Sequence, residues 1–197
     1  MESIYGKIWE MAKPYLDTRS NDIHTEISIR MAYRLLEMED GDMEVVIPAI
    51  TLHDVGYKSI PEELQRQAFG VKTRSPELRR VHEKEGARIA KEILETLNYD
   101  KCKTKEILEI IDGHDSRKEA ISFNDKIVKD ADKLFRYSKM GHQIMSKIAY
   151  EDFGESPLDR LNRLQKQIDG MFFTSAAKEI AREELRDRFL ESEDNDH

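Results

Sequence analysis

The chain of 197 residues carries a net charge of −8, and 37% of its residues are charged. This balance disfavours nucleic acid and anionic membranes as partners, and no apolar run is long enough to span a bilayer. Nine glycines and five prolines are too few for the turns of an all-β protein, and the single cysteine, Cys102, excludes an internal disulfide and favours a reducing cytoplasm.

The spacing of apolar residues predicts an all-α chain. In chain order, the predicted helices cover 2–17, a segment capped by Asn21 or Asp22, 43–54, 76–97, 104–115, a segment capped by Asn124, 138–150 and two segments within 157–192. Residues 55–75 are expected to form a loop or a short helix, and the acidic residues 191–196 a disordered tail. No linker divides the chain, so residues 1–150 are expected to form one helical bundle with 151–197 packed on it.

An apolar run at 45–50 leads to the adjacent pair His53 and Asp54, which places two good metal ligands at the edge of a core. A buried carboxylate is costly unless it is paired or binds a metal. Taken alone, the pair is equally well explained as a core histidine beside a helix-capping aspartate. Three further histidines lie on or beside the apolar faces of other predicted helices: His24, His82 and His114. Four such histidines indicate a shared metal site of the kind that helical bundles build.

A later predicted helix carries two acids, Asp130 and Asp132, and helical periodicity does not choose which of them is the ligand. The ordered set of His24, the pair His53 and Asp54, and a late aspartate resembles the HD-domain superfamily of metal-dependent phosphohydrolases. The late aspartate of that superfamily follows alanine and precedes a basic residue and leucine. The sequence Ala-Asp-Lys-Leu around Asp132 matches this pattern, so the resemblance favours Asp132.

His82 and His114 resemble the two additional histidines of the HD members that bind two metals. The resemblance implies a small stand-alone protein with a helical-bundle HD domain and additional C-terminal helices. It also implies the metal ligands, which are His24, His53 and Asp132 for one ion, His82 and His114 for the other, and Asp54 as the bridging, catalytic carboxylate. Imidazole and carboxylate ligands suit one or two ions of Mn, Fe, Co, Ni or Zn, whereas Mg fits less well.

The reaction implied by the resemblance is attack of a metal-activated hydroxide on a phosphate ester, either a nucleotide or another small phosphorylated metabolite. Four cations near the ligands are expected to hold the substrate phosphates: Lys58, Arg74, Lys133 and Arg136. Asp115 and Asp130 are expected to orient ligand imidazoles from outside the metal shell. His142 lies outside the pattern and is expected at the surface or in the core.

Two departures narrow the group of HD proteins that the chain resembles. No Glu-Asp pair follows Val55, which disfavours the alarmone hydrolases, and no Gly-Tyr-Pro motif follows the later histidines, which disfavours the cyclic-di-GMP phosphodiesterases. The same ligand set also resembles the mixed-valent di-iron oxygenases of this superfamily. A non-catalytic module that binds a metal or a nucleotide is a third interpretation. A homodimer through the C-terminal helices is a further expectation.

Overall fold

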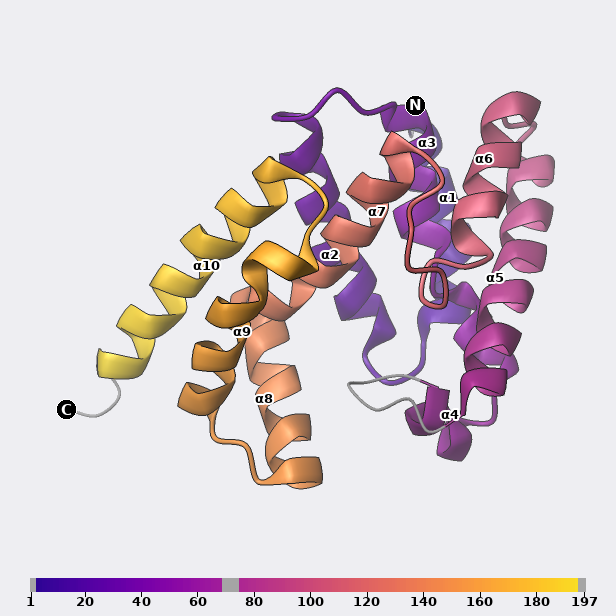
Figure 1. Ribbon diagram of the computed structural model, residues 1–197. Coiled ribbons are helices and arrows are strands. Elements are labelled where there is room, and N and C mark those ends of the chain that lie inside the picture. The colour runs from indigo at the N-terminus through magenta and orange to yellow at the C-terminus, as the bar shows by residue number, and fades with distance from the viewer. Residues whose placement is uncertain (1–2, 69–74, 195–197) are drawn as a thin grey trace.

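The computed structural model describes residues 3–68 and 75–194, and every regular element in these ranges is helical (Figure 1). The α-helices are α1 Ile4–Leu16, α2 Asn21–Leu36, α3 Met43–Leu52, α4 Glu62–Ala68, α5 Pro76–Thr96, α6 Lys101–Ile111, α7 Phe123–Leu134, α8 Lys139–Phe153, α9 Pro157–Met171 and α10 Ser175–Asp194. Two 3-10 helices, η1 Val55–Ser59 and η2 Phe135–Tyr137, follow α3 and α7. The predicted all-α fold is confirmed, and no helix in the described ranges has both the length and the apolar character needed to cross a membrane.

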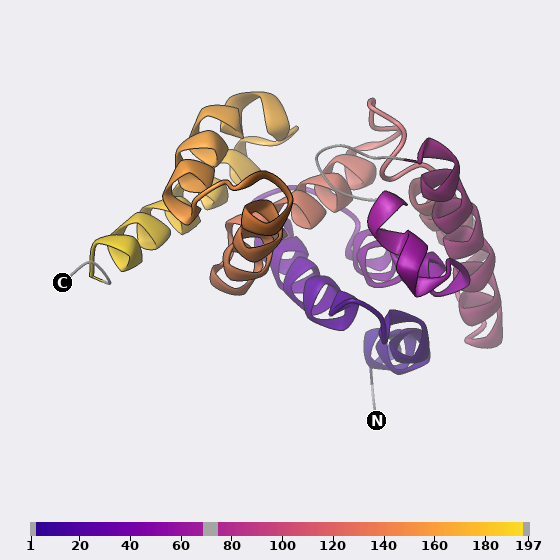
Figure 2. The same cartoon turned by 90° about the horizontal axis from the view of Figure 1, so that it is seen from below.

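Helix α3 lies at the centre of the fold because it is apolar on all sides, and each residue from Val45 to Leu52 is buried. Helices α2, α6 and α7 pack against it, and α5 packs against α6 and η1. Helices α8, α9 and α10 lie on the other side of α7, away from α5 and α6 (Figures 1 and 2). Apolar residues of α9 and α10, among them Leu161 and Ile180, belong to the same hydrophobic cluster as those of α3.

Polar side chains at the starts of α2 and α7 differ in role from the sequence prediction. Ser122 Oγ accepts a hydrogen bond from Asp125 N at 3.1 Å, so Ser122 caps α7, and the prediction that Asn124 begins this helix as its cap is wrong. Asn21 is the first residue of α2 rather than its cap. Its side-chain amide donates to Asp54 O at 3.3 Å, which ties the start of α2 to the turn that carries Asp54.

Two predicted helix ends differ from the structure, and the prediction of a short-helix segment agrees with the described part of 55–75. Helix α6 ends at Ile111 rather than at 115, because Gly113 at φ 133° turns the chain out of the helix, and His114 therefore lies in a turn. Helix α10 continues to Asp194 into the expected tail, while 195–197 lie outside the described residues. The segment 55–75 contains η1 and α4, and its part at 69–74 also lies outside the described residues.

A glycine allows α5 to approach the turn that follows α3. A Cβ atom on Gly56 would lie 1.9 Å from His82 O and 2.5 Å from Gly86 N, both of them backbone atoms of α5. Only a residue without a side chain fits there, so Gly56 brings the helix that carries His82 against the turn that carries Asp54.

Candidate metal centre

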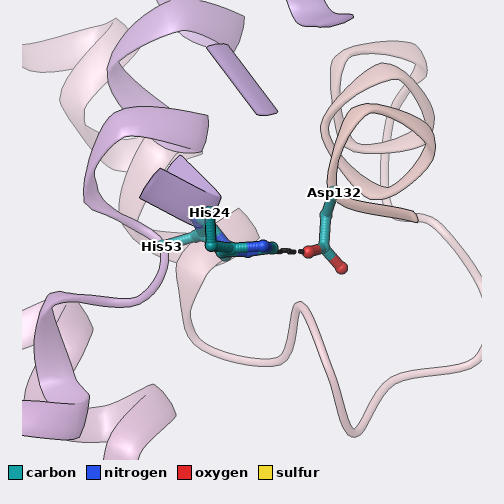
Figure 3. Close-up of side chains that lie close together, drawn as sticks. All are labelled: His24, His53 and Asp132. Carbon is teal, nitrogen blue, oxygen red and sulfur yellow. Dashed lines mark hydrogen bonds and ion pairs between the residues drawn. The ribbon is translucent and has the colours of Figure 1, made fainter. Parts of the chain in front are cut away.

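His24, His53 and Asp132 converge from three segments, namely the first turn of α2, the residue after α3 and the last turn of α7 (Figure 3). The Nε2 atoms of the two histidines lie 3.2 Å apart. Asp132 Oδ1 lies 3.2 Å from His24 Nε2 and 3.8 Å from His53 Nε2. These three donor atoms are close enough to one another to bind the same metal ion.

Asp54 directs its two carboxylate oxygens toward two different pairs of imidazoles. Oδ2 lies 3.5 Å from His24 Nε2 and 3.4 Å from His53 Nε2. Oδ1 lies 3.8 Å from His82 Nε2 and 3.4 Å from His114 Nε2. The Nε2 atoms of His82 and His114 are themselves 3.4 Å apart. The carboxylate therefore stands between two imidazole pairs, which is the placement that a bridging ligand requires.

Asp115 lies on the metal-facing side of the second imidazole pair. Its Oδ2 is 3.6 Å from His82 Nε2 and 3.9 Å from His114 Nε2, and the three residues form a further group able to hold an ion. An orienting carboxylate would instead face the other ring nitrogen, Nδ1. The structure therefore corrects the expectation that Asp115 orients an imidazole from outside the metal shell.

Backbone carbonyls fix the tautomers of two of the histidines. His53 Nδ1 lies 2.7 Å from Ile50 O, and His114 Nδ1 lies 2.9 Å from Ile111 O. Because a carbonyl oxygen only accepts hydrogen bonds, Nδ1 carries the proton in both rings, and each neutral ring has its lone pair on Nε2. Both lone pairs point into the cluster, where carboxylate oxygens and other imidazoles face them.

The cluster has the spacing and the chemistry of a metal site. Ligands bound at about 2.1 Å from one ion lie about 3 to 3.5 Å from each other, and the closest donor contacts in both groups fall between 3.2 and 3.4 Å. Lone pairs and carboxylates that face one another need a cation between them. Mixed imidazole and carboxylate donors suit divalent transition metals.

The charges of the buried groups indicate the same need for cations. Burial would lower the pKa of His114, but the neighbouring charges of Asp115 and Asp54 outweigh burial and raise it to about 10. The pKa of His24 is likewise raised, because its hydrogen bond to Asp132 outweighs its burial. By contrast, burial lowers the pKa of His82 to about 3. Without metal, protons on some imidazoles would therefore balance the carboxylates, and a bound cation would replace those protons.

Two buried charged residues that the sequence did not single out hold the turn that carries His114. Glu83 is fully buried and accepts hydrogen bonds from Asp115 N at 3.0 Å and from Ser116 N at 2.7 Å. Lys129 Nζ, also buried, donates to His114 O at 2.5 Å and to the carbonyls of 113 and 117. The turn is thus held through its N–H groups on one side and its carbonyls on the other.

A cleft of about 1060 Å³ adjoins the metal centre and reaches α8 and α9. His24, Asp54, His114 and Asp132 form part of its wall. The cationic side chains that line it are Arg19, Arg79, Arg117, Lys118, Lys129, Lys133, Arg136, Arg160 and Arg163. Such a cleft beside a cluster of titratable groups is the expected place for a substrate.

The four cations predicted to bind phosphate lie in different surroundings. Arg136 lines the cleft, and the described residues offer its guanidinium no hydrogen-bond or ion-pair partner. Lys133 also lines it, but its Nζ donates to Met171 O at 2.8 Å and so holds the end of α9. Lys58 is exposed, donates to the backbone oxygen of residue 17 and is not part of the cleft wall. Arg74 lies outside the described residues.

Arg79 is a cleft residue that the sequence analysis missed. Its Nε is buried and has no hydrogen-bond partner within the described part of the chain, and the side chain lines the cleft. It lies one turn before Glu83 on α5, in a charged stretch at 77–85 that gave no reason to prefer one cation.

Asp130 and His142 lie away from the metal ligands. Asp130 accepts from Phe173 N at 2.9 Å and from Thr174 N at 2.8 Å, so it binds the segment before α10 instead of a ligand imidazole, and its predicted orienting role is wrong. His142 is buried in α8 and accepts at Nδ1 from Arg160 at 2.9 Å.

This fold and this centre define a class, the helical-bundle proteins that hold metal ions between histidines and aspartates of facing helices. Residues 21–137 match the family model described as HD domain, and the chain therefore belongs to the HD-domain family. The match covers the segment from the start of α2 to the end of η2, which contains all the ligand candidates. Neither a search of curated proteins nor a search of solved structures found a match. The family consists largely of metal-dependent phosphohydrolases, so membership supports a metal-dependent, hydrolase-type function.

Proposed function

We propose that this protein is a metal-dependent phosphohydrolase that cleaves a phosphate ester of a nucleotide or of another small phosphorylated metabolite. The observation that carries the proposal is the placement of Asp54, with one oxygen facing His24 and His53 and the other facing His82 and His114. A carboxylate between two imidazole pairs is what a two-ion hydrolytic centre requires.

In this proposal each ion has its own set of ligands besides Asp54. His24, His53 and Asp132 would hold one ion, and His82, His114 and Asp115 the other. Mn, Fe, Co, Ni and Zn suit such donors. Bound there, the ions would supply an activated water and neutralise phosphoryl charge.

The protein's own cations would bind and orient the phosphate. Arg79 and Arg136 line the cleft beside the metal centre, and the described residues give neither guanidinium a carboxylate partner. A guanidinium donates two parallel hydrogen bonds to a phosphate, which fixes the orientation of the phosphate as well as its position.

Phosphate release tests the proposal. The purified protein is loaded separately with Mn, Co, Ni, Zn or Fe and assayed with nucleoside phosphates, other phosphomonoesters and phosphodiesters. We expect metal-dependent release that Asp54→Ala reduces by at least about 100-fold, because the carboxylate that faces both imidazole pairs is lost. No release from any ester with any metal would contradict the proposal.

The same preparations separate the proposal from its two rivals. Aerobic loading with iron followed by an EPR spectrum would show a mixed-valent signal that responds to substrate if the chemistry is that of a di-iron oxygenase. Tight metal binding with neither phosphate release nor such a signal would favour the non-catalytic module.

A further inference from the structure

Part of the cleft wall is apolar and comes from α8 and α9. Helix α8 lines it with Ile144, Ile148 and Phe153, and α9 and its end add Leu164 and Met171. Ile144 and Ile148 lie four residues apart, and so on the same face of the helix. The family match ends at residue 137, so this wall belongs to the part of the chain outside the HD match.

Leu164 belongs to the core, and Ile144 and Met171 pack against it, whereas Ile148 and Phe153 are more accessible. Ile148 is only partly buried, and within the described residues it packs against neither hydrophobic cluster. Phe153 is 55% exposed. Apolar side chains that face a cleft without a packing partner lower the free energy of a ligand that covers them.

Two arginines that line the cleft near this wall contact other polar groups. Arg160 donates to His142 Nδ1 at 2.9 Å and to Arg136 O at 3.4 Å. Arg163 forms an ion pair with Glu155 at 2.6 Å. These contacts hold both guanidiniums against α8 and the α8–α9 connection. The cleft wall thus combines the candidate metal ligands and several cations with apolar side chains of α8.

We infer that the substrate is a phosphate ester whose organic group is apolar or aromatic, at least as large as an aromatic ring, and rests on Ile144, Ile148 and Phe153 of α8. This inference rests on the proposed function, because the metal centre and the cations beside it would hold the phosphate. It identifies the C-terminal helices as the part of the chain that selects the organic group. Small polar phosphates would leave this wall uncovered and would bind more weakly.

The test separates binding from turnover with two phosphonates, which contain no ester bond for the proposed hydrolysis to cleave. Naphthylmethylphosphonate and methylphosphonate carry the same charged group and differ only in the apolar part. Titration of the metal-loaded protein should give a dissociation constant on the order of tenfold lower for the naphthyl compound, because more apolar surface is buried. Equal affinities would overturn the inference.

Substitutions on α8 test whether this helix is responsible for the preference for the naphthyl compound. Ile148→Ser should weaken binding of the naphthyl compound on the order of fivefold and leave methylphosphonate unchanged, since about three buried carbon atoms are lost. Tyr150→Ser, at a 66% exposed position of α8 that does not line the cleft, is the matched control and should change neither constant. An equal loss for both phosphonates in Ile148→Ser would contradict the inference.

Two further outcomes are distinguishable. Selective naphthyl binding without hydrolysis of any phosphate ester would support the apolar subsite and contradict the proposed function. A change of oligomeric state in Ile148→Ser, measured by sedimentation at equilibrium, would assign this face to a second copy of the chain and overturn the inference.

Discussion

At the scale of single residues, the centre depends on which atom each side chain presents. His53 and His114 present Nε2 because Nδ1 is bound to a carbonyl of the preceding turn, at Ile50 and Ile111. That bond is local, so each ring is oriented before any metal binds. Pre-oriented ligands lose less conformational entropy on binding, which raises the affinity for the ion.

Asp115 gives the first prediction at this scale. Replacement by Asn should remove one charged ligand from the group with His82 and His114. We expect the metal content by elemental analysis to fall from about two ions toward one per chain, with the weaker dissociation constant raised by at least about tenfold. Asp169→Asn, which loses only a surface pair with Arg182, is the control and should keep the full metal content. Two tightly held ions in Asp115→Asn would remove this residue from the ligand set.

Arg79 gives the second prediction. Arg79→Gln should raise KM for the phosphate ester on the order of tenfold, because a charged hydrogen bond to phosphate contributes about 1.5 to 3 kcal/mol. The bound metal should be unchanged. Arg88→Gln serves as the control, since Arg88 lies on the same helix but is exposed and paired with Glu85 and Glu92. The same KM for both variants would show that Arg79 does not bind the phosphate.

The four candidate imidazole ligands could be identified from the sequence, but the residues that hold their backbone in place could not. His24, His53, His82 and His114 are recognisable because an imidazole on an apolar helical face is unusual. Glu83 and Lys129 are not, because in a chain with 37% charged residues nothing local distinguishes a buried charge from a solvated one. The roles of Asp115 and Asp130 depend on side-chain directions, which follow from tertiary contacts and not from periodicity.

At the scale of elements, the centre exists because helices approach at fixed points. Gly56 and Gly86 let η1 and α5 meet backbone to backbone, and a Cβ atom on Gly56 would lie 1.9 Å from His82 O. Asn21 ties the start of α2 to Asp54 O. These contacts are tertiary, so sequence periodicity predicts the helices but not the distances between them.

Gly56→Ala tests this close approach. We expect it to lower the free energy of unfolding by about 3 kcal/mol or more, because the new methyl group meets backbone atoms that cannot rotate away. Gly170→Ala is the matched control, since no atom lies within 4 Å of its added Cβ. In helix α9 it should raise stability by up to about 1 kcal/mol. Urea unfolding of both variants gives the comparison, and similar small effects would contradict the packing argument.

His142, buried between α8 and α9, makes the stability of the protein depend on pH. Burial, followed by the charges of Arg160 and Arg188, lowers the pKa of His142 to about 4. Arg160 only donates, so His142 Nδ1 accepts, and protonation would place a proton against the guanidinium. As the pH falls, the unfolded chain therefore binds this proton at a higher pH than the folded chain. The free energy of unfolding decreases as the pH falls from about 6.5 to about 4.

His142→Asn removes this pH dependence while keeping an acceptor for Arg160. The metal-free wild type should lose up to about 3 kcal/mol more than the variant between pH 6.5 and pH 4, since one pKa unit corresponds to about 1.4 kcal/mol. Urea unfolding of both proteins across this range measures the difference, and groups common to both cancel. Parallel pH curves would show that His142 is not held neutral.

At the scale of the whole molecule, the all-α class and the order of the helices were predictable because the apolar spacing is regular over most of the chain. The cleft was not, because its side chains come from segments spread between Arg19 and Met171, and α8 and α9 carry no recognised motif. The cytoplasmic location and the homodimer stay predictions.

Metal removal tests how far the centre stabilises the whole fold. The candidate ligands come from the starts of α2 and α5, the ends of α3 and α7, and the turn after α6, so an ion bound there would join segments distant in sequence. Anything that binds the folded chain but not the unfolded one stabilises it by about 2.7 kcal/mol at 100 times its dissociation constant. For a chain of this size, a chelator should therefore lower Tm by about 5 to 10 °C.

If the chelator acts by removing the bound ion, the shift in Tm should depend on the residues that hold the ion. His53→Ala lacks a ligand of the first group, so its Tm should respond much less to added Mn or Zn than that of the wild type. His142→Asn keeps every candidate ligand and should show the full shift. An equal response in His53→Ala and the wild type would mean that the ions bind elsewhere. Segments from most of the fold meet at these side chains. If the ions bound elsewhere, metal binding would no longer explain why these side chains lie together.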